Sequence, residues 1–289
     1  MTTITVPRIN DSQWDFRTLW RIWADATHAG DKVTLDFQSC DFLRANAVAF
    51  LGGLIRLLQY RGSTVWIINV GPSIRTNLLK NGFLPAFAGE AHPGYGNTVP
   101  FREDWQRDSA AYQNYLADHW LGQGWVEVSN ALRDAIIERV AEGYQNAFDH
   151  SQSPVGSYTC GQFYPRKREL QLSIVDFGVG IPSNVRECVG EAEKAADSCM
   201  DWAFVRGNTT ATKQGLSRGL GLDLLRDFIQ VNGGKLEILS HDGYISVDQG
   251  GVSSRILPHP FEGTMVNIRI SCDSRFYRLA SENVALVNF

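Results

Sequence analysis

The sequence SNALRDAIIERVAEGYQNAFDH, residues 129–150, decides the fold. Its apolar residues recur at three- and four-residue intervals, which predicts one buried stripe along a helix. The opposite side carries Glu138, Glu142, Asn146 and Asp149 at successive helical steps. A carboxylate and a carboxamide one turn apart share a face, so both can reach one ligand. A solvated polar face on an ordinary amphipathic helix is the competing interpretation, and the downstream sequence must decide.

Composition limits the classes of protein to consider. The 289 residues suffice for two domains, and the 44% hydrophobic content can fill packed cores. A net charge of −4 argues against a general binder of nucleic acid or of membrane surfaces. The sequence contains no membrane-spanning run and no export signal, and its five scattered cysteines form no Cys-x-x-Cys pair. We therefore expect neither a disulfide framework nor a zinc site, and a location in the reducing cytoplasm.

The first third of the chain alternates predicted strands and helices. Strands are indicated at 4–9, 33–37 and 64–70, with helices at 11–26, 42–60 and from Pro72 to about Asn81. This alternation predicts a βαβ unit with a largely parallel sheet.

Four segments of this region are similar to STAS domains: VTLDF, CDFLRANAVAFLGGLIRLL, TVWIINV and LLKNGF. We assign the STAS-like domain to residues 1–95. In STAS partners of anti-sigma kinases that become phosphorylated, a Ser or Thr begins the helix after the first strand. Here that neighbourhood is Arg44-Ala45-Asn46-Ala47, without a hydroxyl, so the resemblance does not imply regulation by phosphorylation there.

Residues 96–126 are predicted to be a linker and a helical segment. Pro and Gly cluster from Pro85 to Pro100, which is typical of a linker. Aromatic residues follow, from Trp105 to Trp120. At helical spacing such residues pack between domains more often than they form a ligand cage.

The region after the central helix alternates strands with glycine-rich turns. Strands are predicted at 158–164, 170–175, 235–240 and 264–270, and a helix at 222–231. The residues from 273 to 289 are expected to form a tail or a docking segment.

Asp176 ends a predicted strand and begins the sequence Asp-Phe-Gly-Val-Gly-Ile-Pro. A carboxylate there can accept a hydrogen bond from the exocyclic amine of adenine, and the glycines can let a flat ring approach the backbone. An ordinary strand-to-loop turn is the alternative.

Residues 217–222, Ser-Arg-Gly-Leu-Gly-Leu, place backbone N–H groups at a helix N-terminus, which favours anions. Arg218 and Lys213 can add contacts to phosphate. A glycine-rich cap on a core helix is the alternative, and residues 207–215 fit either a phosphate-covering lid or an ordinary loop. On the central helix, Asn146 offers an oxygen suited to Mg²⁺, and Glu142 can orient or deprotonate a water.

The motifs E-x-x-x-N-A, D-x-G-x-G-I-P, G-x-G-L and G-T occur in this order between residues 127 and 272. This set resembles the GHKL superfamily of Bergerat-fold ATPases, which includes DNA gyrase, mismatch-repair ATPases, histidine kinases and anti-sigma-factor kinases. The resemblance implies that Glu142 is the general base, Asn146 the Mg²⁺ ligand and Asp176 the adenine-binding residue. It also implies nucleotide-binding roles for Asp149, His150, Gly178, Gly180, Ile181, Lys213, Arg218, Gly219, Leu220, Gly221, Leu222 and Thr264. For His150 a structural role is the alternative.

The sequence therefore predicts an α/β protein. We expect a STAS-like βαβ domain followed by a two-layer α/β sandwich of the Bergerat type with a mixed sheet. The expected function is Mg²⁺-dependent ATP binding with slow hydrolysis, in which the nucleotide state moves a lid and the contact with the STAS-like domain. A serine/threonine kinase of the anti-sigma type and a non-hydrolysing nucleotide-sensing adaptor are the alternatives. We expect a protein partner, through the STAS-like domain, and neither nucleic acid nor membrane; relatives that dimerise leave a homodimer open.

Overall fold

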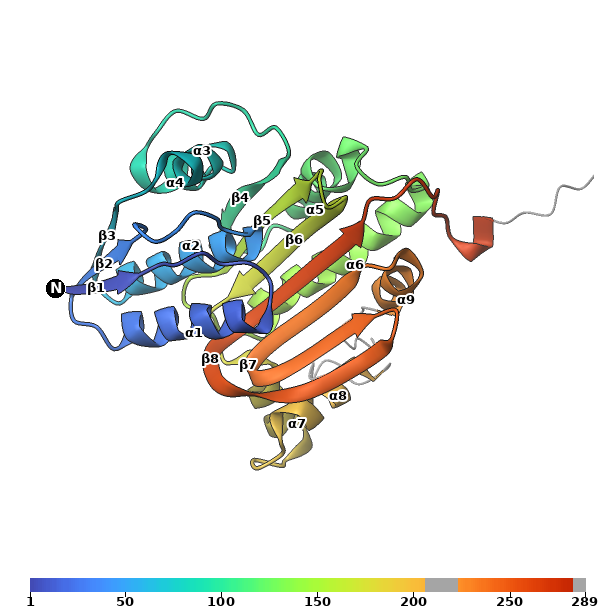
Figure 1. Ribbon diagram of the computed structural model, residues 1–289. Coiled ribbons are helices and arrows are strands. Elements are labelled where there is room, and N and C mark those ends of the chain that lie inside the picture. The colour runs from blue at the N-terminus through green and yellow to red at the C-terminus, as the bar shows by residue number, and fades with distance from the viewer. Residues whose placement is uncertain (206–222, 283–289) are drawn as a thin grey trace, which may run out of the picture.

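A three-stranded parallel sheet opens the chain in the computed structural model, which describes residues 1–205 and 223–282 (Figure 1). Its strands lie in the order β1 (Thr2–Thr5), β2 (Lys32–Asp36) and β3 (Thr64–Ile68). Two helices, α1 (Gln13–Thr27) and α2 (Ala45–Tyr60), connect the strands. The predicted parallel βαβ unit is confirmed. Two short helices, α3 (Pro72–Lys80) and α4 (Phe83–Ala88), follow.

The second sheet has five strands in the order β4-β5-β6-β8-β7. Their bounds are Thr98–Asp104 for β4, Ser157–Tyr164 for β5, Glu169–Asp176 for β6, Lys235–Asp248 for β7 and Gly251–Ser271 for β8. Every pairing between these strands is antiparallel, so the mixed sheet that we expected is wrong for the described residues. For two of the four pairings the cause is local: tight turns join β5 to β6 and β7 to β8, and strands joined by such turns pair antiparallel.

The strand β4 lies in the stretch for which the sequence indicates a linker and a helical segment. It is the edge strand of the second sheet, and its pairing with β5 is irregular between Val99 and Arg102. Pro100 sits in this irregularity. Proline is tolerated in a sheet at such edge positions, where no ladder hydrogen bond is lost.

One face of the five-stranded sheet is covered by three helices that follow β4 in the chain. These are α5 (Ser109–His119), α6 (Asn130–Asp149) and α9 (Asp223–Asn232). The helices α7 (Gly180–Val189) and α8 (Ala196–Phe204) pack on β7 and β8, and short 3₁₀ turns occupy Leu121–Gln123 and Ala280–Glu282. Along β6, Leu170, Leu172 and Ile174 belong to the core on the α6 side, as the predicted alternation requires.

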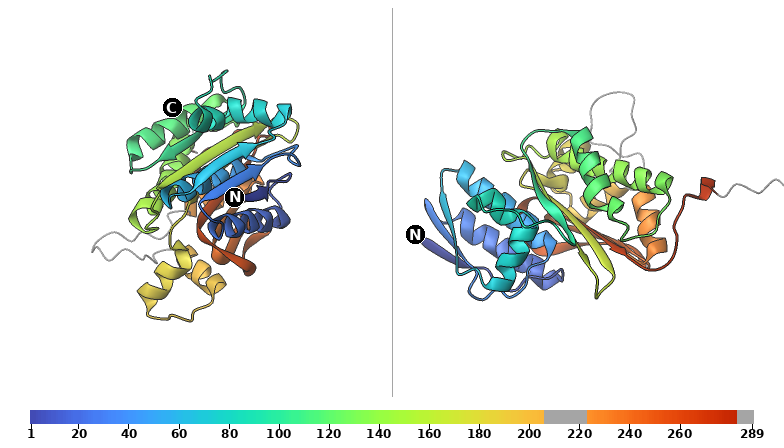
Figure 2. Two further views of the ribbon diagram at one scale, coloured as in Figure 1. Left: turned by 90° about the vertical axis from the view of Figure 1, so that its left-hand side faces the viewer. Right: turned by 90° about the horizontal axis from the view of Figure 1, so that it is seen from above.

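The other face of the same sheet carries the N-terminal half of the molecule, by which we mean residues 1–88 with β1 to β3 and α1 to α4. The helix α2 packs against β5 and β6, and nearly all its residues are buried. A helix that is apolar all round must be covered on all sides. One hydrophobic core therefore joins Phe50 of α2 with Phe177 and Phe261 of the second half. Figure 2 shows the five-stranded sheet between the N-terminal half and the helices α5, α6 and α9.

The segment after β8 docks beside the start of α6. Val128 and Tyr277 form an isolated parallel bridge, and Ser129 donates its N–H to the carbonyl of Tyr277 at 2.9 Å. Residues 273–282 are thus a docking segment, and residues 283–289 lie outside the described part. None of the helices within residues 1–205 and 223–282 is long and apolar enough to span a bilayer.

Candidate functional site

Asp176 is the last residue of β6 and lies between Ser157 of β5 and Thr264 of β8. Its side chain is buried, with 6% exposed. One carboxylate oxygen accepts a hydrogen bond from the N–H of Gly178 at 3.0 Å, and the Ser151 hydroxyl and the Thr264 N–H are near enough to lower the pKa of the carboxyl as well. Burial raises the pKa of Asp176 to about 7, against these hydrogen bonds, which lower it. A ligand that donates a hydrogen bond here would favour the ionised form.

The glycines after Asp176 allow chain segments to touch. A Cβ at Gly178 would lie 2.0 Å from the carbonyl oxygen of Ser151. Gly180 has a φ of +78°, a conformation that L side chains rarely adopt. At Gly178 the close neighbour is protein backbone, so this glycine is required by the fold around Asp176 rather than by an approaching ring.

Ser240, which the sequence did not single out, ties three parts of this region together. It lies on β7 and is fully buried. Its hydroxyl oxygen accepts the N–H of Ile181 at 2.8 Å, and lies 3.1 Å from the carbonyl oxygen of Gly263 and 2.8 Å from Oγ1 of Thr264. The predicted site residues Ile181 and Thr264 are thus held through one hydroxyl. A Ser directly after the apolar pair Ile238-Leu239, at the end of the predicted strand, is the signal that could have identified it.

Glu142 and Asn146 lie one turn apart on α6, and both are half-buried. Ser129 caps this helix, because its hydroxyl oxygen accepts the N–H of Leu132 at 3.1 Å. The Glu142 carboxylate accepts a hydrogen bond from Nη1 of Arg139 at 2.6 Å. Both predicted residues therefore share a face, and a neighbouring guanidinium already holds the carboxylate.

Hydrogen bonds connect the end of α6 to the turn after Asp176. The Ser151 hydroxyl donates to the carbonyl of Ala147, and the Ser151 carbonyl accepts the N–H of Val179 at 2.7 Å. Nδ2 of Asn184 donates to the carbonyl of His150 at 3.0 Å. The C-terminal ends of α6 and of the central strand β6 consequently meet at the same end of the five-stranded sheet (Figure 1).

Asp149 and His150 have structural roles at this helix end. Asp149 forms a half-exposed ion pair with Arg107, with Nη1 at 2.8 Å and 3.1 Å from the two carboxylate oxygens. His150 is the C-cap, and its N–H donates to the carbonyl of Asn146 at 3.1 Å. The ion pair fastens α6 to the segment before α5.

The phosphate-binding part of the prediction cannot be placed. Its residues Lys213, Arg218, Gly219, Leu220, Gly221 and Leu222 all lie outside the described residues. The structure therefore brings together the helix motif, the strand-end motif and Thr264 only.

The residues present fit a metal with few protein ligands. Within residues 1–205 and 223–282, no group of three or more His, Cys, Asp or Glu side chains is placed to hold a metal ion. Mg²⁺ commonly keeps several waters and is bound through one or two protein groups together with phosphate. The half-buried amide of Asn146, one turn from Glu142, suits that kind of coordination.

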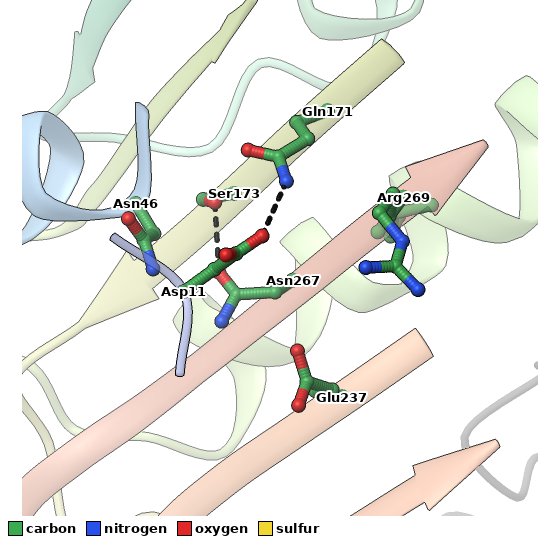
Figure 3. Close-up of a pocket in the computed structure, with 8 residues that line it drawn as sticks. Asp11, Asn46, Gln171, Ser173, Glu237, Asn267 and Arg269 are labelled. Carbon is green, nitrogen blue, oxygen red and sulfur yellow. Dashed lines mark hydrogen bonds between the residues drawn. The ribbon is translucent and has the colours of Figure 1, made fainter. Parts of the chain in front are cut away.

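A small polar pocket of about 10 Å³, enough for roughly one water molecule, lies on the opposite face of the sheet (Figure 3). It is lined by Asp11, Asn46, Gln171, Ser173, Glu237, Asn267, Ile268 and Arg269. Protein groups already occupy its carboxylates, since Asp11 accepts from Gln171 at 2.8 Å and Glu237 accepts from Tyr244 at 2.6 Å. In the described part of the chain, Nδ2 of Asn267 is buried without a partner. This pocket lies under the beginnings of α1 and α2 and is separate from the Asp176 region.

Comparison with protein-family models gives no match, and a search of curated proteins gives none either. A function for this chain is therefore inferred from its sequence motifs and from the geometry around Asp176.

Proposed function

We propose that the protein binds Mg²⁺·ATP in a site of the GHKL type within residues 127–272, and that it hydrolyses the nucleotide slowly. In this proposal residues 1–95 are a STAS-like regulatory domain. The observation that carries it is the buried carboxyl of Asp176 at the end of β6, next to Thr264. The turn that follows Asp176 is joined by hydrogen bonds to the end of α6. The chemistry of that carboxyl suits a neutral ligand that offers an N–H group, such as adenine.

Each residue then has a defined task. The Asp176 carboxylate accepts the exocyclic amine of adenine, and the Thr264 hydroxyl, fixed by Ser240, supports the same edge of the ring. Asn146 contributes an amide oxygen to Mg²⁺, which neutralises phosphate charge when bound. Glu142 orients the attacking water and accepts its proton. Because Asp176 is buried, little water competes with adenine for its carboxylate.

A non-hydrolysing nucleotide sensor is the second candidate, and one contact favours it. Arg139 occupies the Glu142 carboxylate at 2.6 Å, which leaves less of its acceptor capacity for a water. The anti-sigma-type kinase remains a third outcome, in which the phosphoryl group passes to a separate protein through the STAS-like half. The five free cysteines fit the proposed location in a reducing cytoplasm.

Calorimetric titration of the full chain with ATP and Mg²⁺ tests the binding step. We expect saturable heat with the wild type and a loss of affinity of roughly 100-fold in Asp176→Ala, because a buried acceptor for the base is removed. GTP is the control ligand, since its base presents a carbonyl where adenine presents an amine. An absence of heat with the wild type would refute the proposal.

Steady-state hydrolysis tests the role of Glu142. We expect Glu142→Gln to lower ATP turnover by about 100-fold or more while ATP still binds, because a general base typically contributes that much. Glu138→Gln is the matched control, since Glu138 lies one turn earlier and also approaches Arg139, at 3.4 Å. Equal turnover by wild type and Glu142→Gln would contradict the base role of Glu142. A wild type that binds ATP without hydrolysing it over hours would favour the sensor, and transfer of labelled phosphate to a protein would favour the kinase.

A further inference from the structure

Phe177 follows Asp176 directly and is buried against the N-terminal half of the chain. Its ring centroid lies 5.4 Å from that of Phe50 on α2 and 6.2 Å from that of Phe261 on β8. Phe50 and Phe261 lie 5.7 Å apart, and Trp20 of α1 packs on Phe261 at 6.1 Å. These four rings are at most 3% exposed, so none can move without displacing a neighbour.

The glycines of α2 make room for this packing. A Cβ at Gly53 would lie 2.4 Å from Cε2 of Phe177 and 2.6 Å from Cδ2 of Tyr158. At the adjacent position Gly52, a Cβ would lie 2.4 Å from two ring carbons of Phe101 on β4. Gly53 thus makes room for the rings of Phe177 and Tyr158, and Gly52 for that of Phe101; of the three, only Phe177 directly follows Asp176.

The β8 side of the proposed adenine site is anchored in the same way. Phe261 lies two residues before Gly263, and a Cβ at Gly263 would meet the Phe261 ring at 2.8 Å and the Asp176 carbonyl at 2.1 Å. Gly263 leads into Thr264, which pairs with Asp176. The end of β6 and the middle of β8, which flank the proposed site, therefore each place an aromatic ring against Phe50 of α2.

We infer that α2 is part of the support of the nucleotide site: Phe177, seated over Gly53, and Phe261 position Asp176 and Thr264 for the base. This inference rests on the proposed function. Phe177 and Gly53 act through Asp176 and do not touch the nucleotide. A partner whose binding to the N-terminal half changes the packing of α2 would therefore alter ATP affinity, and ATP would alter the affinity for that partner by the same factor.

The test compares Gly53→Ala with Gly52→Ala in the full chain. Both substitutions add one methyl group to the same buried helix and force aromatic rings to move: Phe177 and Tyr158 in Gly53→Ala, and Phe101 in Gly52→Ala. We expect Gly53→Ala to weaken ATP binding by roughly tenfold or more, because displacements below 1 Å in supporting residues disturb a preorganised site, and Gly52→Ala to change it by less than about threefold. Isothermal titration gives the affinities, and thermal unfolding shows whether the two variants lose comparable stability.

A compensating variant separates positioning from general destabilisation. Phe177→Leu removes ring atoms that the new methyl group would meet, so we expect Gly53→Ala/Phe177→Leu to bind ATP more tightly than Gly53→Ala alone. If Gly53→Ala does not fold, Phe177→Leu alone decides, with Phe101→Leu as its control: weaker ATP binding only in Phe177→Leu supports the inference. Equal ATP affinities in the matched variants overturn this inference alone, whereas a wild type that binds no ATP overturns the proposed function as well.

Discussion

The two faces of the five-stranded sheet differ in how their side chains are distributed. On the α6 side, β6 presents Leu170, Leu172 and Ile174, and the face is apolar along its length. On the other side the same strand presents Gln171 and Ser173 and then Val175. The second face is therefore polar at one end and apolar at the end that leads to Asp176.

The helix α2 matches this gradient, since it lies along β5 and β6. Its middle, around Phe50 and Gly53, packs at the apolar end. Its beginning is polar: Arg44 is buried, 3.2 Å from the carboxylate of Glu169 and 3.4 Å from that of Asp11. Buried ion pairs add little net stability but are costly to mispair, so the polar end can fix the register of the N-terminal half while the apolar end stabilises it.

The largest expected effect is on the apolar end of this shared core. Phe50→Ala should lower the free energy of unfolding by about 3 to 5 kcal/mol, because it removes a fully buried ring that contacts Phe177 and Phe261. On the opposite face, Ile136→Ala should cost about 2 to 5 kcal/mol. Urea unfolding followed by circular dichroism and by Trp fluorescence measures both.

A single transition that shifts as a whole in both variants would show that the two faces stabilise one cooperative unit. Two transitions, with Phe50→Ala affecting only one of them, would contradict a shared core.

The next effect concerns the pH dependence of stability. The folded pKa of Asp176, about 7, lies above the ordinary aspartate value of 3.8, so the folded chain holds this proton over a range in which the unfolded chain has released it. The free energy of unfolding should therefore fall as the pH rises from about 4 to 7, by roughly 2 to 4 kcal/mol from this group. Asp176→Asn should remove that slope and be the more stable form near pH 8.

Chemical denaturation at a series of pH values, with wild type and Asp176→Asn side by side, provides the measurement. Parallel profiles for the two proteins would mean that Asp176 is not held protonated by burial. Nucleotide should flatten the wild-type profile, since a donor on the ligand stabilises the ionised carboxylate and so lowers the pKa of Asp176 in the folded state.

The spacing of apolar residues in the sequence predicted the elements that bury one continuous face against a single core. The apolar stripe of α6 and the alternation of β6 depend only on spacing, and both are confirmed. Gln171 and Ser173 show the limit of such evidence, because alternation alone indicates a solvated face, whereas both side chains are buried under the N-terminal half. Their environment depends on distant contacts, because Gln171 donates to Asp11, 160 positions away, and Ser173 to Asn267, 94 positions away.

The missed features also depend on tertiary contacts. The strand β4 contains Pro100, which disfavours a strand unless the strand lies at an edge, and edge position is not visible in sequence. Ser240 gains its role because β7 pairs with β8 so that Ser240 lies opposite Thr264. Asp176 was predictable, since a carboxylate at a strand end before two glycines is local; the pKa that burial gives it was not.

The smallest expected effect sharpens the contrast between exposed and buried charge. Arg107 and Asp149 are each about half exposed, so water screens their ion pair. Arg107→Ala should lower the free energy of unfolding by less than about 1 kcal/mol, and by less still in roughly 0.5 M salt. Arg44→Met, in the buried cluster on the other face, should cost several times more, because it leaves Asp11 and Glu169 without their shared cation. Denaturation at low and high salt compares the two variants, and a larger cost for Arg107→Ala than for Arg44→Met would contradict the difference expected from their exposure.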